Sequence, residues 1–119
     1  MKRGDVSEVE WLEFRRKNQD ALLRHTYNIT LKQRDAMERA QEYRCAICQN
    51  EEPIIDPRSG QRRHLAVDHD HKTGENRALI CSSCNLTLGH LKDCPERLLQ
   101  LIQYLARHES IRRSTEKIR

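Results

Sequence analysis

Two pairs of cysteines stand out among the residues of this chain that could do chemistry. Cys45 and Cys48 form one CxxC motif, and Cys81 and Cys84 form a second. Four thiolates at this spacing are typical of a single tetrahedral Zn²⁺. The sequence therefore predicts a structural zinc site that joins two distant stretches of the chain.

A second group of polar residues lies between and beside these pairs. Asp68, His69 and His71 occur in one short stretch, and Asn85 directly follows the last of the four cysteines. Hydrolysis of a phosphodiester needs a base that activates water and a cation that stabilises the developing charge. Histidine is the base whose unperturbed pKa lies near neutrality, and a carboxylate with an amide oxygen is a suitable partial shell for Mg²⁺. The pattern indicates a reaction site framed by the predicted zinc.

Two short strands and the turn between them are expected to position these groups. Residues 64–68 and 76–80 are short apolar segments bounded by turn residues, which predicts a β-hairpin. Alternation along the first strand sends Asp68 to one side and His69 and His71 to the other. The hairpin and the helix expected after the fourth cysteine form a β-β-α unit.

Helices are predicted on the N-terminal side of this unit. Residues 7–24 carry apolar residues suited to one broad face, and Thr30 with Gln33 forms a capping box for a helix that ends near Tyr43. Residues 49–63 contain Pro and Ser-Gly turn signals, which predicts an irregular loop or short ribbon.

The C-terminal part is also predicted to be helical. A helix should run on from Asn85 until Gly89 interrupts or ends it, and a last helix should have Asp93 as its cap and Pro95 in its first turn. An apolar stripe on that last helix either packs within the monomer or forms a dimer interface; it consists of Leu98, Leu99, Leu101, Ile102 and Leu105.

Composition supports a small zinc protein. The 119 residues have the length of one ordinary domain, but only 36% are hydrophobic and 4% aromatic, whereas 34% are charged. A structural metal is a common remedy for so thin a core. No segment approaches the roughly 20 apolar residues of a membrane span, and residues 1–20 do not resemble a secretory leader. Paired CxxC motifs in such a chain favour a metal over disulfides and predict a cytoplasmic location.

Charge is unevenly distributed along the chain. Residues 1–44 hold ten Lys/Arg against eight Asp/Glu, and residues 96–119 hold six against three. Residues 45–95 are slightly acidic, with six against seven. Basic flanks suit a polyanion such as nucleic acid, although solvated helix faces would give the same composition.

The ordered combination of these motifs resembles the recombination endonuclease VII family of HNH (ββα-metal) nucleases. The resemblance covers roughly residues 27–105. It is carried by Tyr27-Asn-Ile-Thr-Leu31, Cys45-Ala-Ile-Cys48, Leu65-Ala-Val-Asp-His-Asp-His-Lys-Thr-Gly74, Arg77-Ala-Leu-Ile-Cys-Ser-Ser-Cys-Asn85, Leu88-Gly-His-Leu91 and Pro95-Glu-Arg97.

The resemblance implies a metal-dependent DNA endonuclease. His69 would be the general base, and Asp68 and Asn85 would hold a catalytic Mg²⁺ or Mn²⁺ that stabilises the leaving 3′ oxygen. His71 would orient the scissile phosphate or assist at the metal. One departure is Leu88, which stands where the prototype of the family has an acidic residue that assists the metal site.

The implied fold is α+β and mostly helical, with a small zinc-bound ββα core flanked by terminal helices. Residues 1–26 would form an N-terminal helical extension, 27–105 the nuclease domain and 106–119 a basic tail. DNA, duplex or branched, would be the partner, no membrane is involved, and the terminal helices could form a homodimer. The family suggests a phage or mobile-element protein in a bacterial cell. The alternative function is a noncatalytic zinc module that binds nucleic acid.

Overall fold

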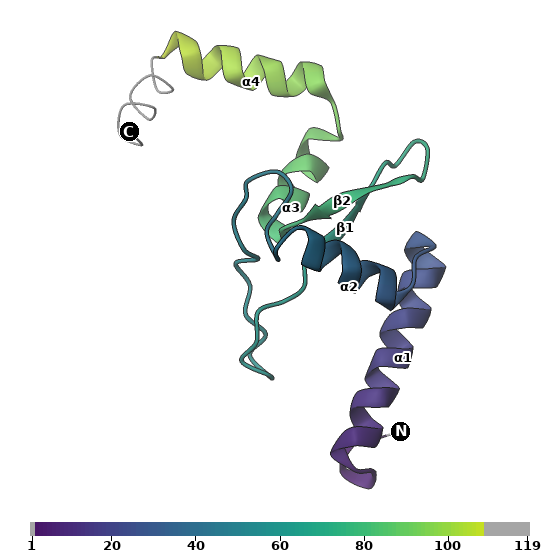
Figure 1. The fold of residues 1–119 in the computed structure, drawn as a ribbon. Helices are drawn as coiled ribbons and strands as arrows, with labels where there is room; N and C mark the ends of the chain where they lie inside the picture. Colours follow the sequence, from purple (N-terminus) through teal and green to yellow (C-terminus); the bar gives the residue numbers. More distant parts are fainter. Residues whose placement is uncertain (1, 109–119) are drawn as a thin grey trace. The chain divides into compact units, whose positions relative to one another are not determined.

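The structure is a computed structural model that describes residues 2–108, in two compact units that divide after Asn85. The fold is α+β and mostly helical, as predicted (Figure 1). The N-terminal unit holds the first two helices, the hairpin and the start of α3, and the C-terminal unit holds the rest. In chain order the elements are η1 (Arg3–Asp5), α1 (Glu8–Tyr27), α2 (Leu31–Ala40), β1 (Ala66–His69), β2 (Asn76–Ile80), α3 (Ser82–Leu91) and α4 (Pro95–Arg107).

Capping boxes start both N-terminal helices. The predicted box at Thr30 and Gln33 is confirmed, with each side chain bonded to the backbone N–H of the other. A second box joins Ser7 and Glu10 at the start of α1. Asn28 then ends α1 in the left-handed conformation, at φ 56°. Together these local signals explain why the chain turns sharply between α1 and α2.

Asp20 fastens the two helices to each other. Its carboxylate accepts hydrogen bonds from the backbone N–H of Leu31 and from Nε of Arg24, both at 2.7 Å. A second link runs from Arg16 of α1 to Asp35 of α2 at 3.2 Å. In Figure 1 the N-terminal part of α1 projects away from the hairpin. Accordingly α1 has no buried residue, so its predicted apolar side is only partly covered.

The hairpin pairs β1 with β2 in antiparallel fashion, and α2 lies against β2 (Figure 1). The second strand matches the predicted residues 76–80, whereas the first is shifted to Ala66–His69. A β-bulge interrupts the register between Val67 and His69. The loop that precedes the hairpin is irregular, with one antiparallel bridge between Ile55 and Arg62, as the turn signals predicted.

The core is small and centred on the hairpin. Among the described residues it includes no aromatic side chain, and two of its members are cysteines. Leu79, Ile80 and Cys45 are the most completely buried of the described side chains. The buried apolar set consists of Leu31, Cys45, Leu65, Val67, Leu79, Ile80, Cys81 and Leu91. So thin a core agrees with a domain that relies on a metal for part of its stability.

Two predictions about the C-terminal helices are wrong. The helix α3 begins at Ser82 and continues through Gly89 to Leu91, because a single glycine costs a helix too little to end it. Asp93 does not cap α4, since its φ of 52° is left-handed and an N-cap residue is extended. Cys94 occupies that position, and Pro95 is in the first turn as predicted.

The apolar stripe of α4 is present, with its five side chains 43–54% exposed. None of the described helices is long and apolar enough to span a bilayer.

Candidate metal centre and reaction site

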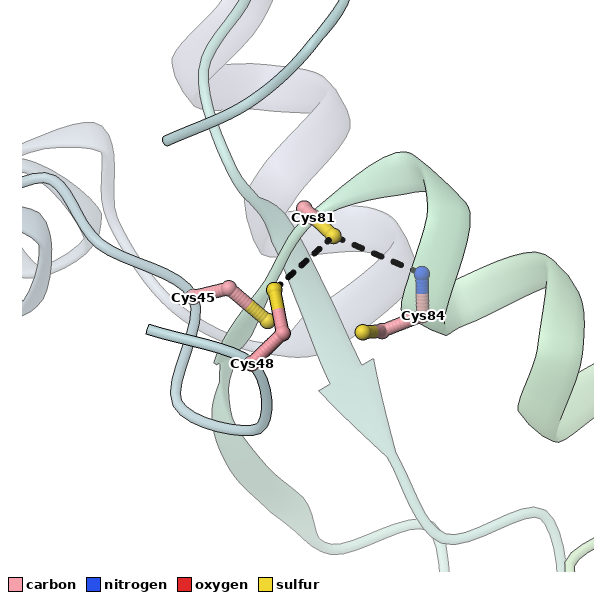
Figure 2. A group of neighbouring side chains, drawn as sticks. All are labelled: Cys45, Cys48, Cys81 and Cys84. Carbon is pink, nitrogen blue, oxygen red and sulfur yellow. Dashed lines mark hydrogen bonds between the residues drawn. The ribbon is translucent and has the colours of Figure 1, made fainter. Parts of the chain in front are cut away.

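The four predicted zinc ligands converge. Cys45 and Cys48 lie on a tight loop, and Cys81 and Cys84 lie at the start of α3, with all four sulfur atoms close together (Figure 2). These sulfurs lie within 4.8 Å of one another, and Cys48 Sγ is 3.9 Å from Cys81 Sγ. A tetrahedral Zn²⁺ with Zn–S bonds of about 2.3 Å needs sulfurs about 3.8 Å apart. The cluster therefore fits zinc, and no disulfide joins these cysteines.

Local backbone geometry forms the first half of the cluster. Gln49 takes the left-handed conformation, at φ 66°, and its N–H donates to the carbonyl of Cys45. The backbone N–H of Ile47 points to Cys45 Sγ at 3.3 Å, and the N–H of Cys84 points to Cys81 Sγ at 3.4 Å. Such N–H groups favour thiolate over thiol.

These surroundings make the four thiols unequal. Burial opposes ionisation of Cys45, but backbone N–H groups, including that of Ile47, lower its pKa to about 6. Burial raises the pKa of Cys81, and burial together with the neighbouring sulfurs raises the pKa of Cys84 to about 12. At neutral pH and without a metal, Cys81 and Cys84 therefore carry protons that zinc must displace.

Two side chains outside the predicted site fasten this cluster to the hairpin. The side-chain amide of Gln41 accepts a hydrogen bond from the Leu79 N–H at 3.0 Å and donates one to the Leu79 carbonyl at 2.9 Å. It thereby satisfies backbone groups at the free edge of β2. The buried Glu52 accepts from the Ser82 hydroxyl at 2.6 Å and from the Ser82 N–H at 3.2 Å. Glu52 thus caps α3 and adds a negative charge at the positive end of the helix.

Asp68 lies on β1 and is engaged by an arginine. Its two carboxylate oxygens accept from Nε and Nη2 of Arg77, at 2.6 and 3.0 Å. The Asp68 side chain is 12% exposed, and that of Arg77 is 40% exposed. The predicted metal ligand is therefore a buried carboxylate in a bidentate ion pair.

His69 and His71 lie together, as strand alternation predicted. Their ring centroids are 4.6 Å apart. The ring of Tyr27, the last residue of α1, meets His69 edge-on at 5.4 Å. Asn76, which faces His69 across the hairpin, donates from Nδ2 to the Tyr27 carbonyl at 2.7 Å. The end of α1 is thus attached to the strand end that carries the predicted base.

Asn85 lies in the first turn of α3 with its side chain exposed, and its N–H donates to the carbonyl of Cys81. Within the described residues it makes no hydrogen bond to Asp68 or His69. The four cysteines thus lie close to one another, the two histidine rings lie close to each other, and Asn85 lies on the helix that begins directly after Cys81.

One further acidic residue and one histidine near the hairpin, Asp70 and His64, have structural roles. Asp70 accepts from the N–H groups of Lys72 and Thr73, which lowers its pKa and closes the hairpin turn. His64 Nδ1 lies 3.1 Å from the buried carboxylate of Glu38.

The fold and the cysteine cluster define a small zinc-type module built on a β-hairpin and a helix. Comparison with known families identifies it further. Residues 20–107 match the model of the recombination endonuclease VII family, and the chain belongs to that family.

Two curated relatives come from mycobacteriophages. The chain is similar to the Gene 59 protein of Mycobacterium phage D29, with 40% identity over 94 residues, and to the Gene 59 protein of Mycobacterium phage L5, with 38% identity over 94 residues. Each match covers 78% of this chain but only 53% of the relative, so the chain spans about half the length of these relatives. No solved structure matches the chain significantly.

Sequence reasoning did not assign Tyr27, Gln41, Glu52 or Arg77 a role. Tyr27 and Arg77 fall within the motifs of the family resemblance, but their contacts depend on the hairpin register. Gln41 and Glu52 act across 38 and 30 residues of chain, and no local pattern announces such contacts.

Proposed function

We propose that this chain is the catalytic part of a metal-dependent DNA endonuclease of the HNH type. The observation that carries the proposal is the placement of Asp68 and His69 on a hairpin strand, next to a helix start that a four-cysteine cluster holds and on which Asn85 lies. Membership of the recombination endonuclease VII family supports the nuclease class.

The proposed reaction is hydrolysis of a DNA phosphodiester. Water attacks phosphorus, the P–O3′ bond breaks, and the products carry a 5′-phosphate and a 3′-hydroxyl. His69 accepts the proton of the attacking water, because imidazole is the side chain best suited to general base catalysis and His69 lies at the strand end beside the proposed metal ligand. Tyr27 packs against this ring and restricts its orientation. His71, beside it, orients the scissile phosphate.

Asp68 and Asn85 are the residues proposed to hold Mg²⁺ or Mn²⁺. A carboxylate and an amide oxygen suit such a cation, which takes its remaining ligands from water and phosphate. When bound, it would stabilise the negative charge on the leaving 3′ oxygen. Cys45, Cys48, Cys81 and Cys84 are the proposed ligands of a structural zinc, whose role is to hold α3 at the hairpin.

Further assignments follow from the same proposal. Residues 27–105 would form the nuclease domain, 1–26 a helical extension and 106–119 a basic tail, of which 109–119 lie outside the described residues. DNA, duplex or branched, is the proposed substrate. One site per chain cuts one strand at a time, so a homodimer through the exposed stripe of α4 would allow both strands to be cut. The proposed location is the cytoplasm of a phage-infected bacterial cell.

A nicking assay tests the proposal. Supercoiled plasmid and a four-way junction are incubated with Mg²⁺ and wild-type protein, His69→Ala, or His90→Ala as a matched control on an exposed histidine. Wild type and His90→Ala should cut, and His69→Ala should lose at least about a hundredfold in rate, which is the usual contribution of a general base.

Two results would contradict the proposal at different points. If wild type binds DNA and never cuts it, the chain is a noncatalytic nucleic-acid-binding zinc module. If His69→Ala cuts as fast as wild type, the protein is a nuclease but the base is another residue.

A further inference from the structure

The ion pair between Asp68 and Arg77 is the most tightly bonded feature of the proposed reaction site. The guanidinium approaches side-on, with Nε and Nη2 each bonded to a different carboxylate oxygen at 2.6 and 3.0 Å. Bidentate pairs of this kind fix geometry as well as charge. The Asp68 carboxylate is therefore oriented before any cation arrives.

The β-bulge of the hairpin explains why these two residues meet. On one side of the bulge Val67 faces Leu79, and on the other side His69 faces Asn76. Two residues of β2, Arg77 and Ala78, therefore face the single residue Asp68. Bulges commonly re-aim a side chain next to a functional site. The pairing of Asp68 with Arg77 thus follows from the backbone register of the hairpin and does not depend on a chance conformation of a surface side chain.

Occupation of both oxygens affects cation binding. A carboxylate has about four lone-pair positions, and the side-on guanidinium takes one on each oxygen. A divalent cation on the same group would also lie a few ångströms from the positive guanidinium, and the two positive charges repel each other around a carboxylate that is only 12% exposed. Arg77 also lies near enough to Asp70 to help lower the pKa of that carboxyl. The positive charge of Arg77 therefore acts on two carboxylates, Asp68 and Asp70.

We propose that Arg77 holds the metal-binding carboxylate of Asp68 and competes with the divalent cation, so that cation binding releases at least one of the two guanidinium contacts. This inference rests on the proposed assignment of Asp68 as a metal ligand. Arg77 is then a positioning residue that orients the carboxylate, and it keeps the site's affinity for cations low until DNA supplies further oxygen ligands.

The test measures Mn²⁺ binding to the zinc-loaded full chain without DNA, from the loss of the free-Mn²⁺ EPR signal. Arg77→Gln removes the charge, and Arg77→Lys keeps the charge but cannot bond both oxygens in the same plane. Arg16→Gln is the matched control, because it removes one charge from a surface pair with Asp35. Asp68→Asn is made in the wild-type and Arg77→Gln backgrounds. Circular dichroism and zinc content identify variants that fold.

Arg77→Gln should bind Mn²⁺ at least about tenfold more tightly than wild type, in line with the effect of one nearby charge on a carboxylate. Arg77→Lys should fall between them, and Arg16→Gln should match wild type. Asp68→Asn should abolish the gain.

Equal or weaker binding by Arg77→Gln, with binding still lost in Asp68→Asn, would overturn the inference and leave the proposed metal site intact. Binding that is unaffected by Asp68→Asn in both backgrounds would show that Asp68 is not the ligand, and both proposals would fail.

Discussion

His69 depends on its neighbours for its orientation. The Tyr27 ring meets it edge-on at 5.4 Å, and the Tyr27 carbonyl is bonded to Asn76 on the opposite strand. An imidazole that acts as a base must keep one ring nitrogen directed at the attacking water. At the scale of single residues, a packing contact from α1 therefore contributes to the proposed chemistry.

Removing this contact should slow cleavage without unfolding the protein. Tyr27→Ala should lower the cleavage rate about tenfold, because small misplacements of a catalytic group are costly, whereas Tyr27→Phe keeps the ring and should match wild type. Single-turnover cleavage rates provide the measurement, and Tyr43→Ala, on an exposed tyrosine, is the control. Equal rates for Tyr27→Ala and wild type would show that the contact does not orient His69.

Asp20 gives the N-terminal helices a pH-dependent link. The N–H of Leu31 and the Arg24 side chain both bond its carboxylate and lower its pKa below the ordinary value of 3.8. The unfolded chain then binds a proton more readily than the folded one. The stabilisation is fully present above about pH 4 to 5 and is lost as the pH falls through the folded pKa.

Thermal melts between pH 2.5 and 6 should show this loss in wild type and a reduced pH dependence in Asp20→Asn. Glu13→Gln, which removes one carboxylate from the exposed side of α1, serves as the control. If Asp20→Asn and Glu13→Gln change the acid side of the stability profile equally, the Asp20 link has no special role.

Among the elements, the start of α3 connects the cysteine cluster to the proposed reaction site. Cys81, Cys84 and Asn85 lie within its first turn or directly before it, and the buried Glu52 caps it through Ser82. A helix that carries a proposed metal ligand must begin at a fixed point. The cysteine cluster and the Glu52 cap together fix that point.

Truncation of the cap should therefore destabilise the protein. Glu52→Ala leaves the partly buried N–H and hydroxyl of Ser82 without their acceptor and should lower the free energy of unfolding by about 1–3 kcal/mol. The adjacent Glu51 is exposed and pairs with Arg62, so Glu51→Ala should cost less than about 1 kcal/mol. Urea unfolding of the two variants, compared at equal zinc content, checks the difference. Equal losses would show that Glu52 does not act as a cap.

Some features of these elements could be predicted from the sequence, and others could not. The cap at Thr30 and the second strand follow from local residue types, and both predictions are confirmed. The four cysteines converge as their spacing indicates, and zinc binding by them stays a prediction. The cap at Ser7 has the same local signature and was open to prediction. Pairing of Asp68 with Arg77 was not, because it depends on a one-residue bulge that changes which side chains face each other.

Errors at the C-terminal helices have a similar origin. The favourable cap residue Asp93 adopts a left-handed backbone, as does Lys92, so the chain turns there and the helix starts later. Residue preference alone does not determine the backbone conformation at a turn. The relation of Asn85 to Asp68 likewise depends on tertiary geometry, so its role stays a prediction.

At the scale of the whole molecule, the thin core and the cysteine cluster belong together. Two of the eight buried apolar residues that the structure describes are cysteines of the cluster. Zinc binding should therefore contribute directly to folding. The unequal thiols add a pH dependence, because Cys81 and Cys84 have raised pKa values and must lose protons when the metal binds.

Substitutions of single cysteines should distinguish the four cysteines of the cluster from Cys94, which lies outside it. Cys45→Ser should lose zinc and much of its helical circular dichroism signal, whereas Cys94→Ser, outside the cluster, should retain one zinc per chain. Zinc affinity of wild type should rise with pH between 6 and 8, as proton competition weakens. Metal analysis and competition with a chelator measure both effects. Full zinc content in Cys45→Ser would contradict the assigned ligand set.

The proposed function of this fold is hydrolysis of DNA by attack of water on phosphorus. The most direct measurement is cleavage of a labelled junction or duplex by the wild-type protein with Mg²⁺ in ¹⁸O-labelled water, followed by mass analysis of the new ends. The prediction is a 3′-hydroxyl on one fragment and a 5′-phosphate with one ¹⁸O atom on the other. DNA that is bound but remains intact, or new ends that carry a 3′-phosphate, would contradict it.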